Sequence, residues 1–95
     1  RSSSEMQAVS AVVSGRVQGV GFRYSTQAMG KRLGLVGWVR NQPDGSVATH
    51  AQGDQAVVAA FVEYLQAGPQ AARVTSVDVA SAEPDPSLTG FQVRY

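Results

Sequence analysis

Two patterns in the sequence predict an α+β fold in which one antiparallel sheet carries both helices on a single face. Five segments alternate apolar and polar residues with the period of a half-buried strand. Two other segments repeat apolar residues at the three-to-four spacing of a helix. Their order is strand, helix, strand, strand, helix, strand, with a short extra strand at the C-terminus. This order is that of a split βαβ sandwich.

The first half of the pattern runs from residue 8 to residue 34. Residues 8–14 alternate as a strand whose one side carries Val9, Ala11 and Val13. The helix that follows presents one apolar stripe, formed by Phe22, Thr26, Met29 and Leu33. Gly34 stands where a helix closes in a left-handed turn. Gly30 lies inside the helix at a cost of about 1 kcal/mol relative to alanine, so we expect a close helix–sheet contact there.

The second half repeats this arrangement with a hairpin in front. Residues 35–41 and 46–52 read as two strands joined by the turn sequence Pro43-Asp44-Gly45. Asp54 is placed to cap a second helix with the apolar stripe Val57, Val58, Phe61 and Leu65. Gly68-Pro69 ends that helix. A strand over 74–80 and a terminal strand with Phe91, Val93 and Tyr95 complete a ferredoxin-like fold, although the pattern leaves the sheet position of the terminal strand open.

Length and composition limit the possible classes of protein. The 95 residues suffice for one domain, which we place at 6–95 after a five-residue expression remnant or disordered tail at 1–5. A net charge of +1 gives no global attraction for nucleic acid or membranes. The chain has no cysteine, and no apolar run approaches a spanning helix. We therefore expect a cytoplasmic monomer that contacts neither nucleic acid nor membrane.

A glycine-rich segment separates the first strand from the first helix, and we call residues 15–21 the glycine loop. Its three glycines permit a backbone in which several N–H groups converge on one point, beside the positive end of the helix dipole. Arg23 falls in the first helical turn, from which a guanidinium can hold two oxygens of an anion. The segment lacks the Gly-Lys-Ser/Thr of a nucleotide P-loop and the spacing of the dinucleotide fingerprint. The loop alone fits either a phosphate-sized anion site or a tight strand-to-helix turn.

Two sequence motifs resemble the signatures of the acylphosphatase family. The first is Val13-Ser14-Gly15-Arg16-Val17-Gln18-Gly19-Val20-Gly21-Phe22-Arg23, and the second is Gly37-Trp38-Val39-Arg40-Asn41 followed by Asp44-Gly45-Ser46-Val47. The resemblance covers nearly everything from about residue 8 to Tyr95. It implies a small hydrolase of the carboxyl–phosphate bond of acylphosphates that releases inorganic phosphate and uses no metal or cofactor. It also implies that Arg23 binds the phosphate and that Asn41 positions the attacking water. The phosphoryl oxygens would be bound by the backbone N–H groups of Val17, Gln18, Gly19, Val20, Gly21 and Phe22.

The residue types present are compatible with this chemistry. A carboxylate leaving group has a pKa of about 4 and departs without a proton, so no general acid is required. Phosphoryl transfer depends mainly on positioning and charge stabilisation, which one arginine, a backbone loop and an amide can supply. His50 is the only histidine, and its strand parity points it away from the helices.

Two other functions compete with hydrolysis. One is a phosphate-binding accessory module of weak activity, because domains resembling acylphosphatases also occur inside proteins that handle carbamoyl phosphate. The other is an RNA-binding domain, which needs exposed aromatic residues on the central strands. The strands at 8–14 and 46–52 contain none, so we rank RNA binding far below the others.

Overall fold

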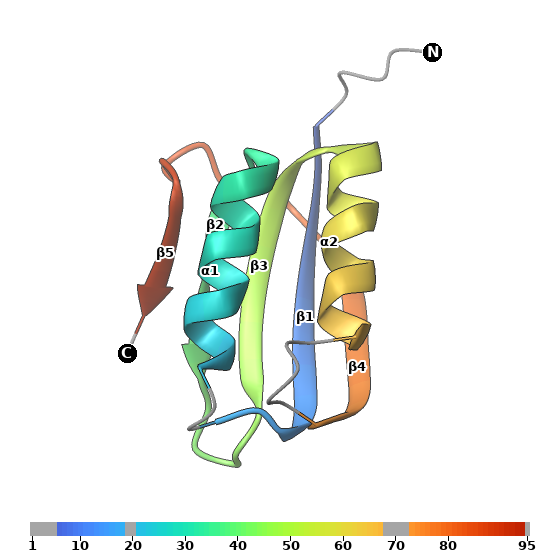
Figure 1. Cartoon of the computed structure of the whole chain (residues 1–95). Coiled ribbons are helices and arrows are strands. Elements are labelled where there is room, and N and C mark those ends of the chain that lie inside the picture. The colour runs from blue at the N-terminus through green and yellow to red at the C-terminus, as the bar shows by residue number, and fades with distance from the viewer. Residues whose placement is uncertain (1–5, 19–20, 68–72, 95) are drawn as a thin grey trace.

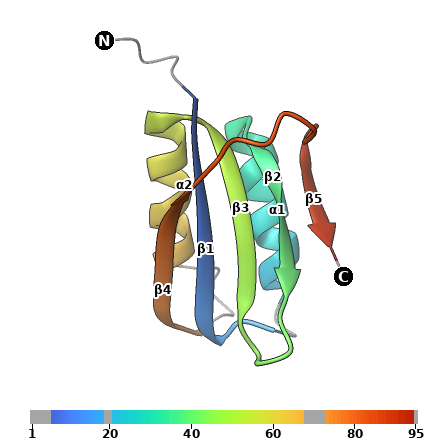
Figure 2. The same cartoon turned by 180° about the vertical axis from the view of Figure 1, so that it is seen from behind.

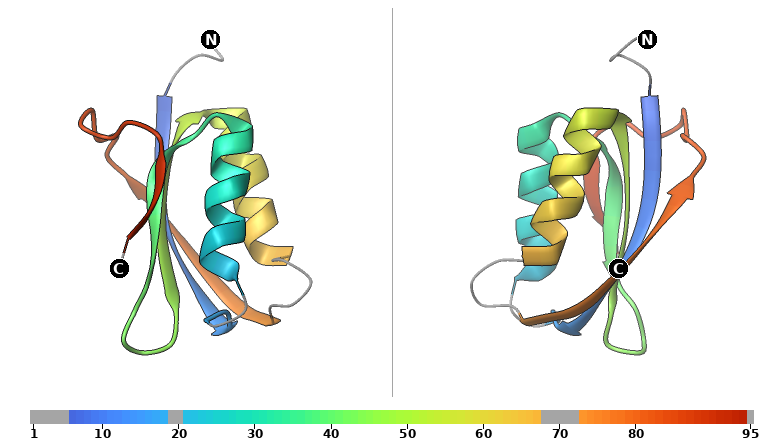
Figure 3. Two further views of the ribbon diagram at one scale, coloured as in Figure 1. Left: turned by 60° about the vertical axis from the view of Figure 1, so that its left-hand side comes forward. Right: turned by 90° about the vertical axis from the view of Figure 1, so that its right-hand side faces the viewer.

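The computed structural model describes residues 6–18, 21–67 and 73–94, and these residues form one sheet with two helices on one of its faces (Figures 1 and 3). The elements are β1 (Met6–Arg16), α1 (Phe22–Leu33), β2 (Val36–Asn41), β3 (Val47–Asp54), α2 (Gln55–Ala67), β4 (Arg73–Ala82) and β5 (Phe91–Arg94). The predicted α+β sandwich and its element order are therefore confirmed. The expectations for residues 1–5, for Gly68-Pro69 and for Tyr95 lie outside the described residues.

The sheet has the strand order β4-β1-β3-β2-β5. The first four strands pair antiparallel, as predicted, and the terminal strand β5, whose sheet position the sequence left open, pairs parallel to β2. The chain leaves β4 at the end of the sheet where β2 begins, and it crosses the face without helices to reach the far edge (Figure 2). A strand that starts there has to run in the direction of β2.

Strand boundaries differ from the predicted ones for local reasons. β1, β3 and β4 are longer than predicted because backbone pairing continues beyond the alternating side chains. Leu35 precedes β2, since its N–H donates to the Gly30 carbonyl and closes the C-terminus of α1. Ser46 belongs to the turn, where its N–H and hydroxyl both bond the Asp44 carboxylate.

The core lies between the sheet and the helices. Both predicted helix stripes face it, and the residues that are at most 2% exposed include Val13, Val17, Phe22, Val39, Val47, Val58, Phe61, Leu65 and Phe91. Burying a side chain of this size contributes roughly 1.5–3 kcal/mol. A Cβ built on Gly30 would lie 2.4 Å from the ring of Phe91, which confirms the predicted close approach of α1 to the sheet.

The other sheet face is covered in part by the connection between β4 and β5. The side-chain amide of Gln52 donates to the Asp85 carbonyl, and its oxygen accepts the Asp85 N–H, at 2.9 and 2.8 Å. His50 lies on this face, as its parity predicts, where its Nε2 is 2.9 Å from Gln52 Oε1 and its ring stacks on Trp38. Within the described residues, neither helix is long and apolar enough to cross a membrane.

Candidate active site

The glycine loop begins at an irregularity between β1 and β4. The register of the two strands shifts between Ser14 and Gly15. Gly15 has a φ of 123°, and a Cβ there would lie 2.1 Å from the Arg73 carbonyl oxygen. Only glycine fits this contact, which lets the chain leave the sheet toward the start of α1.

The start of α1 has backbone donors without a side-chain cap. Gly21 caps the helix at φ 77°, and its carbonyl accepts the Ser25 N–H at 2.9 Å. Its position has no side chain to cap the helix, and no acidic residue lies in the first turn. The first N–H groups of a helix have no intrahelical acceptors and carry a partial positive charge. Phe22, 1% exposed, fixes this end of the helix in the core.

The backbone N–H of Val17 already has a partner in this structure. Its N–H donates to the Gly15 carbonyl at 3.1 Å, and its side chain is fully buried. The tight turn that follows Gly15 therefore uses the amide that the resemblance assigns to the phosphate. Gly19 and Val20 lie outside the described residues.

Asn41 is the last residue of β2 and has an unusual environment. Its Oδ1 is buried and has no hydrogen-bond partner within the described part of the chain. Leaving a buried acceptor unpaired costs about 1–3 kcal/mol. A water molecule that donates to this oxygen would remove that cost.

The turn after Asn41 is held by its own hydrogen bonds. The Gln42 N–H donates to Ser46 O at 2.8 Å, and the Gly45 N–H donates to Gln42 O at 3.1 Å. The Ser46 hydroxyl donates to Asp44 at 2.6 Å, and this bond is the main cause that lowers the pKa of the Asp44 carboxyl below 3.8. These bonds fix the end of β2 at which Asn41 lies.

Gln18 connects the glycine loop to this turn through its side chain. Its Nε2 donates to the carbonyls of Gln42 and Ser46, both at 2.9 Å. These bonds join residues that lie 24 and 28 positions apart in sequence, and they connect the segments of the two signatures. Sequence reasoning assigned Gln18 a backbone role and missed this link, for which the pattern carries no signal.

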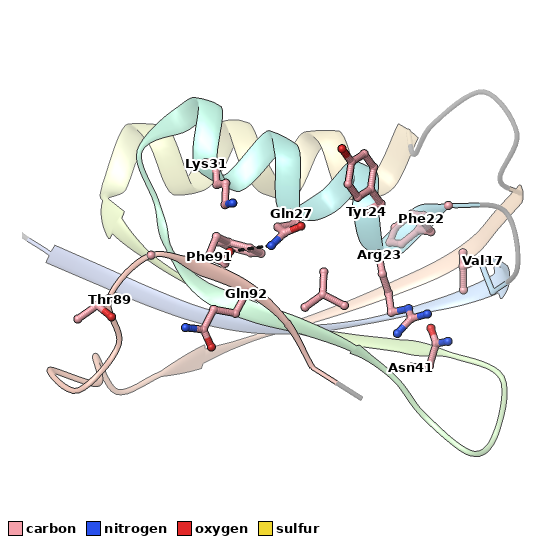
Figure 4. A pocket seen from close by; sticks show the side chains of 13 residues that line it. Val17, Phe22, Arg23, Tyr24, Gln27, Lys31, Asn41, Thr89, Phe91 and Gln92 are labelled. Carbon is pink, nitrogen blue, oxygen red and sulfur yellow. Dashed lines mark hydrogen bonds between the residues drawn. The ribbon is translucent and has the colours of Figure 1, made fainter.

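Arg23 and Asn41 both line one hollow of about 800 Å³ between α1 and β5. Figure 4 shows their side chains directed to the same end of it, near Val17. Gly21 and Phe22 also line this hollow, whereas Gln18 does not. The structure thus brings Arg23, Asn41 and the start of α1 together.

A second side chain unforeseen from the sequence lies one turn beyond Arg23. The Gln27 amide lines the hollow and donates to the Phe91 carbonyl at 3.1 Å (Figure 4). This bond ties α1 to β5 beside the site. The spacing of four residues from Arg23 places both side chains on one helix face, which is the signal that could have identified Gln27.

These features define a class: a small α+β sandwich in which an arginine, a buried amide oxygen and a helix start without a side-chain cap line one hollow. The acylphosphatase family model matches residues 9–93. The chain is 51% identical over 84 residues to an acylphosphatase of Anaeromyxobacter dehalogenans, covering 88% of this chain and 90% of that relative. An acylphosphatase of a Nocardioides species is 52% identical over 87 residues, covering 92% and 87%. The chain belongs to the acylphosphatase family.

Solved structures agree with this assignment. The crystal structure of acylphosphatase from Bacillus subtilis superposes with a TM-score of 0.88 at 35% identity, covering 94% of this chain and 99% of that one. HypF from T. kodakarensis matches with a TM-score of 0.81 at 27% identity, but the match covers only 12% of that chain. The same fold therefore also occurs as a small part of a much longer protein.

Proposed function

We propose that this protein hydrolyses acylphosphates to a carboxylate and inorganic phosphate. The observation that carries the proposal is the joint placement of Arg23 and the buried Asn41 Oδ1 at one end of the hollow. This oxygen has no hydrogen-bond partner among the described residues, and it lies beside a start of α1 that has no side-chain cap. This arrangement offers charge for a phosphoryl group and an acceptor for water. Inhibition by inorganic phosphate, the product, is expected.

Phosphoryl binding uses the cation and the backbone donors. The Arg23 guanidinium holds two phosphoryl oxygens, and the amides from Gln18 to Phe22 bind the others. For Val17 to take part, its N–H has to break its hydrogen bond to the Gly15 carbonyl and donate to a phosphoryl oxygen instead. Negative charge on the three oxygens is stabilised most in the transition state.

Asn41 orients the nucleophile and takes no proton. Its Oδ1 accepts one hydrogen of a water molecule, whose oxygen attacks phosphorus in line with the leaving carboxylate. The new P–O bond forms as the bond to the acyl oxygen breaks, and the electron pair leaves with the carboxylate. The proton of the water passes to a phosphoryl oxygen.

An accessory module is the weaker alternative. The chain spans about 90% of relatives that are themselves named acylphosphatase, whereas it spans 12% of HypF. Arg23 and Asn41 are both present in this chain. These points support turnover over binding alone.

The test is hydrolysis of benzoyl phosphate in the presence of a chelator. Removing one positioned donor costs about 10²–10³ in kcat, so Arg23→Gln is expected to lose at least 100-fold and to lose phosphate inhibition. Asn41→Ala is expected to lose kcat while phosphate inhibition remains. Arg32→Gln removes an equal charge from the same helix outside the hollow and serves as control.

Three results would contradict the proposal. They are phosphate binding without any turnover in the wild type, near-full kcat in Asn41→Ala, and a loss below tenfold in Arg23→Gln. Sensitivity to the chelator would contradict the expected independence of metal. The monomeric state, the cytoplasmic location and the single domain at 6–95 stay predictions from the sequence.

A further inference from the structure

The hollow is larger than a phosphoryl group requires. Its volume of about 800 Å³ falls in the range of roughly 300–1,000 Å³ that is typical for sites of whole small molecules. Arg23, Asn41 and the start of α1 occupy only one end (Figure 4). The remaining space lies between α1 and β5 and is available to the acyl part of a substrate.

One face of α1 forms the wall of this space. Arg23, Gln27 and Lys31 follow at intervals of four residues, and all three line the hollow. Lys31 lies eight positions after Arg23, so the helical rise separates their Cα atoms by about 12 Å. Figure 4 shows Lys31 at the end opposite Asn41, extending toward β5. The opposite wall is built by Phe91 and Val93.

The charges of this space have one sign. Among the described residues that line it, two are cations, Arg23 and Lys31, and none is Asp or Glu. The Gln27 amide between them already donates to the Phe91 carbonyl. A neutral acyl group would therefore leave the Lys31 ammonium without a counter-charge from the ligand, whereas a second anion would meet it.

We infer that the far part of the hollow is an acyl-group subsite, in which Lys31 selects acylphosphates that carry a second anionic group. The inference rests on the proposed function. The second anion is a carboxylate or a phosphate ester at the end of the acyl group away from the reacting phosphorus. Lys31 determines specificity and does not take part in the chemical step.

The test uses rigid substrates of matched shape. The kcat/KM values of 4-carboxybenzoyl phosphate and of its neutral analogue, 4-carbamoylbenzoyl phosphate, are measured for the wild type and for Lys31→Met. An exposed ion pair of this kind changes a binding equilibrium by at most about fivefold. The ratio of the two kcat/KM values is expected to fall about fivefold in Lys31→Met and to fall further in Lys31→Glu. Comparing ratios cancels the intrinsic reactivity of each substrate.

The controls separate this inference from the proposed function. Arg32→Gln, a charge loss outside the hollow on the same helix, should leave the ratio of the two kcat/KM values unchanged. Added salt should reduce this ratio in the wild type. A third substrate with a phosphate ester at the same position shows which anion is preferred. Hydrolysis of both benzoyl derivatives with a ratio that Lys31→Met leaves unchanged overturns the subsite alone. Failure to hydrolyse any acylphosphate overturns both proposals.

Discussion

At the scale of single residues, two buried polar atoms have no hydrogen-bond partner in the described structure. They are Oδ1 of Asn41 and Oγ1 of Thr26. Asn41 lines the hollow, so water or substrate can reach its side chain. Thr26 is fully buried in the core-facing stripe of α1 and does not line the hollow. The polar atom without a partner therefore has a role in the proposed chemistry at Asn41, whereas at Thr26 the structure shows no role for it.

Replacing Thr26 by the isosteric valine should stabilise the protein. The change removes a buried hydroxyl that has no partner among the described residues, and an unpaired buried group of this kind costs about 1–3 kcal/mol. We expect the free energy of unfolding in urea to rise by about 1 kcal/mol, with kcat unchanged. Thr26→Ala is the control, because it also removes the hydroxyl but leaves a cavity and should destabilise. A loss of stability in Thr26→Val would mean that the hydroxyl has a partner.

At the scale of elements, the site depends on how the glycine loop and the β2–β3 turn are joined. Gln18 makes this junction with two hydrogen bonds to the Gln42 and Ser46 carbonyls. The loop carries the proposed phosphoryl donors, and the turn fixes Asn41. In the proposed mechanism, the distance between the phosphoryl group and the attacking water therefore depends on a side chain that touches neither.

Gln18→Ala should separate catalysis from binding. Without the junction, Asn41 and the loop are no longer held in register, and we expect kcat to fall about tenfold. Inhibition by phosphate should weaken less than kcat falls, because Arg23 stays in place although the loop amides lose their anchor. Gln18→Glu should be worse, since a carboxylate would face two carbonyl oxygens. Equal losses of kcat and phosphate binding would indicate general misfolding, and Gln66→Ala on the surface of α2 is the control.

At the scale of the whole molecule, two turns at the ends of the sheet depend on aspartate. Asp44 accepts from the Ser46 hydroxyl, and Asp85 accepts from the Ser87 hydroxyl in the connection that leads to β5. These bonds are the main cause that lowers the pKa of both carboxyls below 3.8. The Asp44 carboxylate stabilises the turn of the β2–β3 hairpin, which positions Asn41. The Asp85 carboxylate stabilises the connection between β4 and β5, which positions β5.

Stability should therefore decline in acid. Each carboxyl has a lower pKa in the folded state than in the unfolded chain, so its contribution is present above about pH 4 and is lost as the pH falls through the folded value. We expect the urea concentration at the unfolding midpoint to decrease as the pH is lowered from 5 to 3. The double variant Asp44→Asn, Asp85→Asn should flatten this dependence. An equally steep decline in the double variant would assign the acid sensitivity to other groups.

Most of the elements could be predicted because they follow from local patterns. The period of the apolar residues gives α1 and α2, and Gly34 marks a helix end that the structure confirms. The contact at Gly30 was predictable from the helix-propensity cost alone, although its partner, Phe91, was not. The role of Asn41 came from a resemblance of motifs alone, since an isolated asparagine at a strand end usually forms a turn. Arg23 was also indicated by its place in the first helical turn after the glycine loop.

The rest depends on contacts between distant segments. The parallel pairing of β5 follows from where β4 ends, and the engaged amide of Val17 follows from a bulge against β4. The Gln18 junction joins two segments more than 20 residues apart. The residue pattern of one sequence indicates periodicity and local conformation, but it does not indicate which distant backbone groups come into contact.

By itself, the sequence determined the α+β sandwich and the glycine loop before a helix, while it left open whether this loop binds an anion or only makes a tight turn. These depend on backbone propensities and on the spacing of apolar residues, which act over a few positions. Only the tertiary structure decided that the Asn41 oxygen is buried beside Arg23 without a partner among the described residues, and that Lys31 shares their hollow. The reason is physical: burial and charge environment are set by packing across the sheet, where neighbours in space are far apart in the chain.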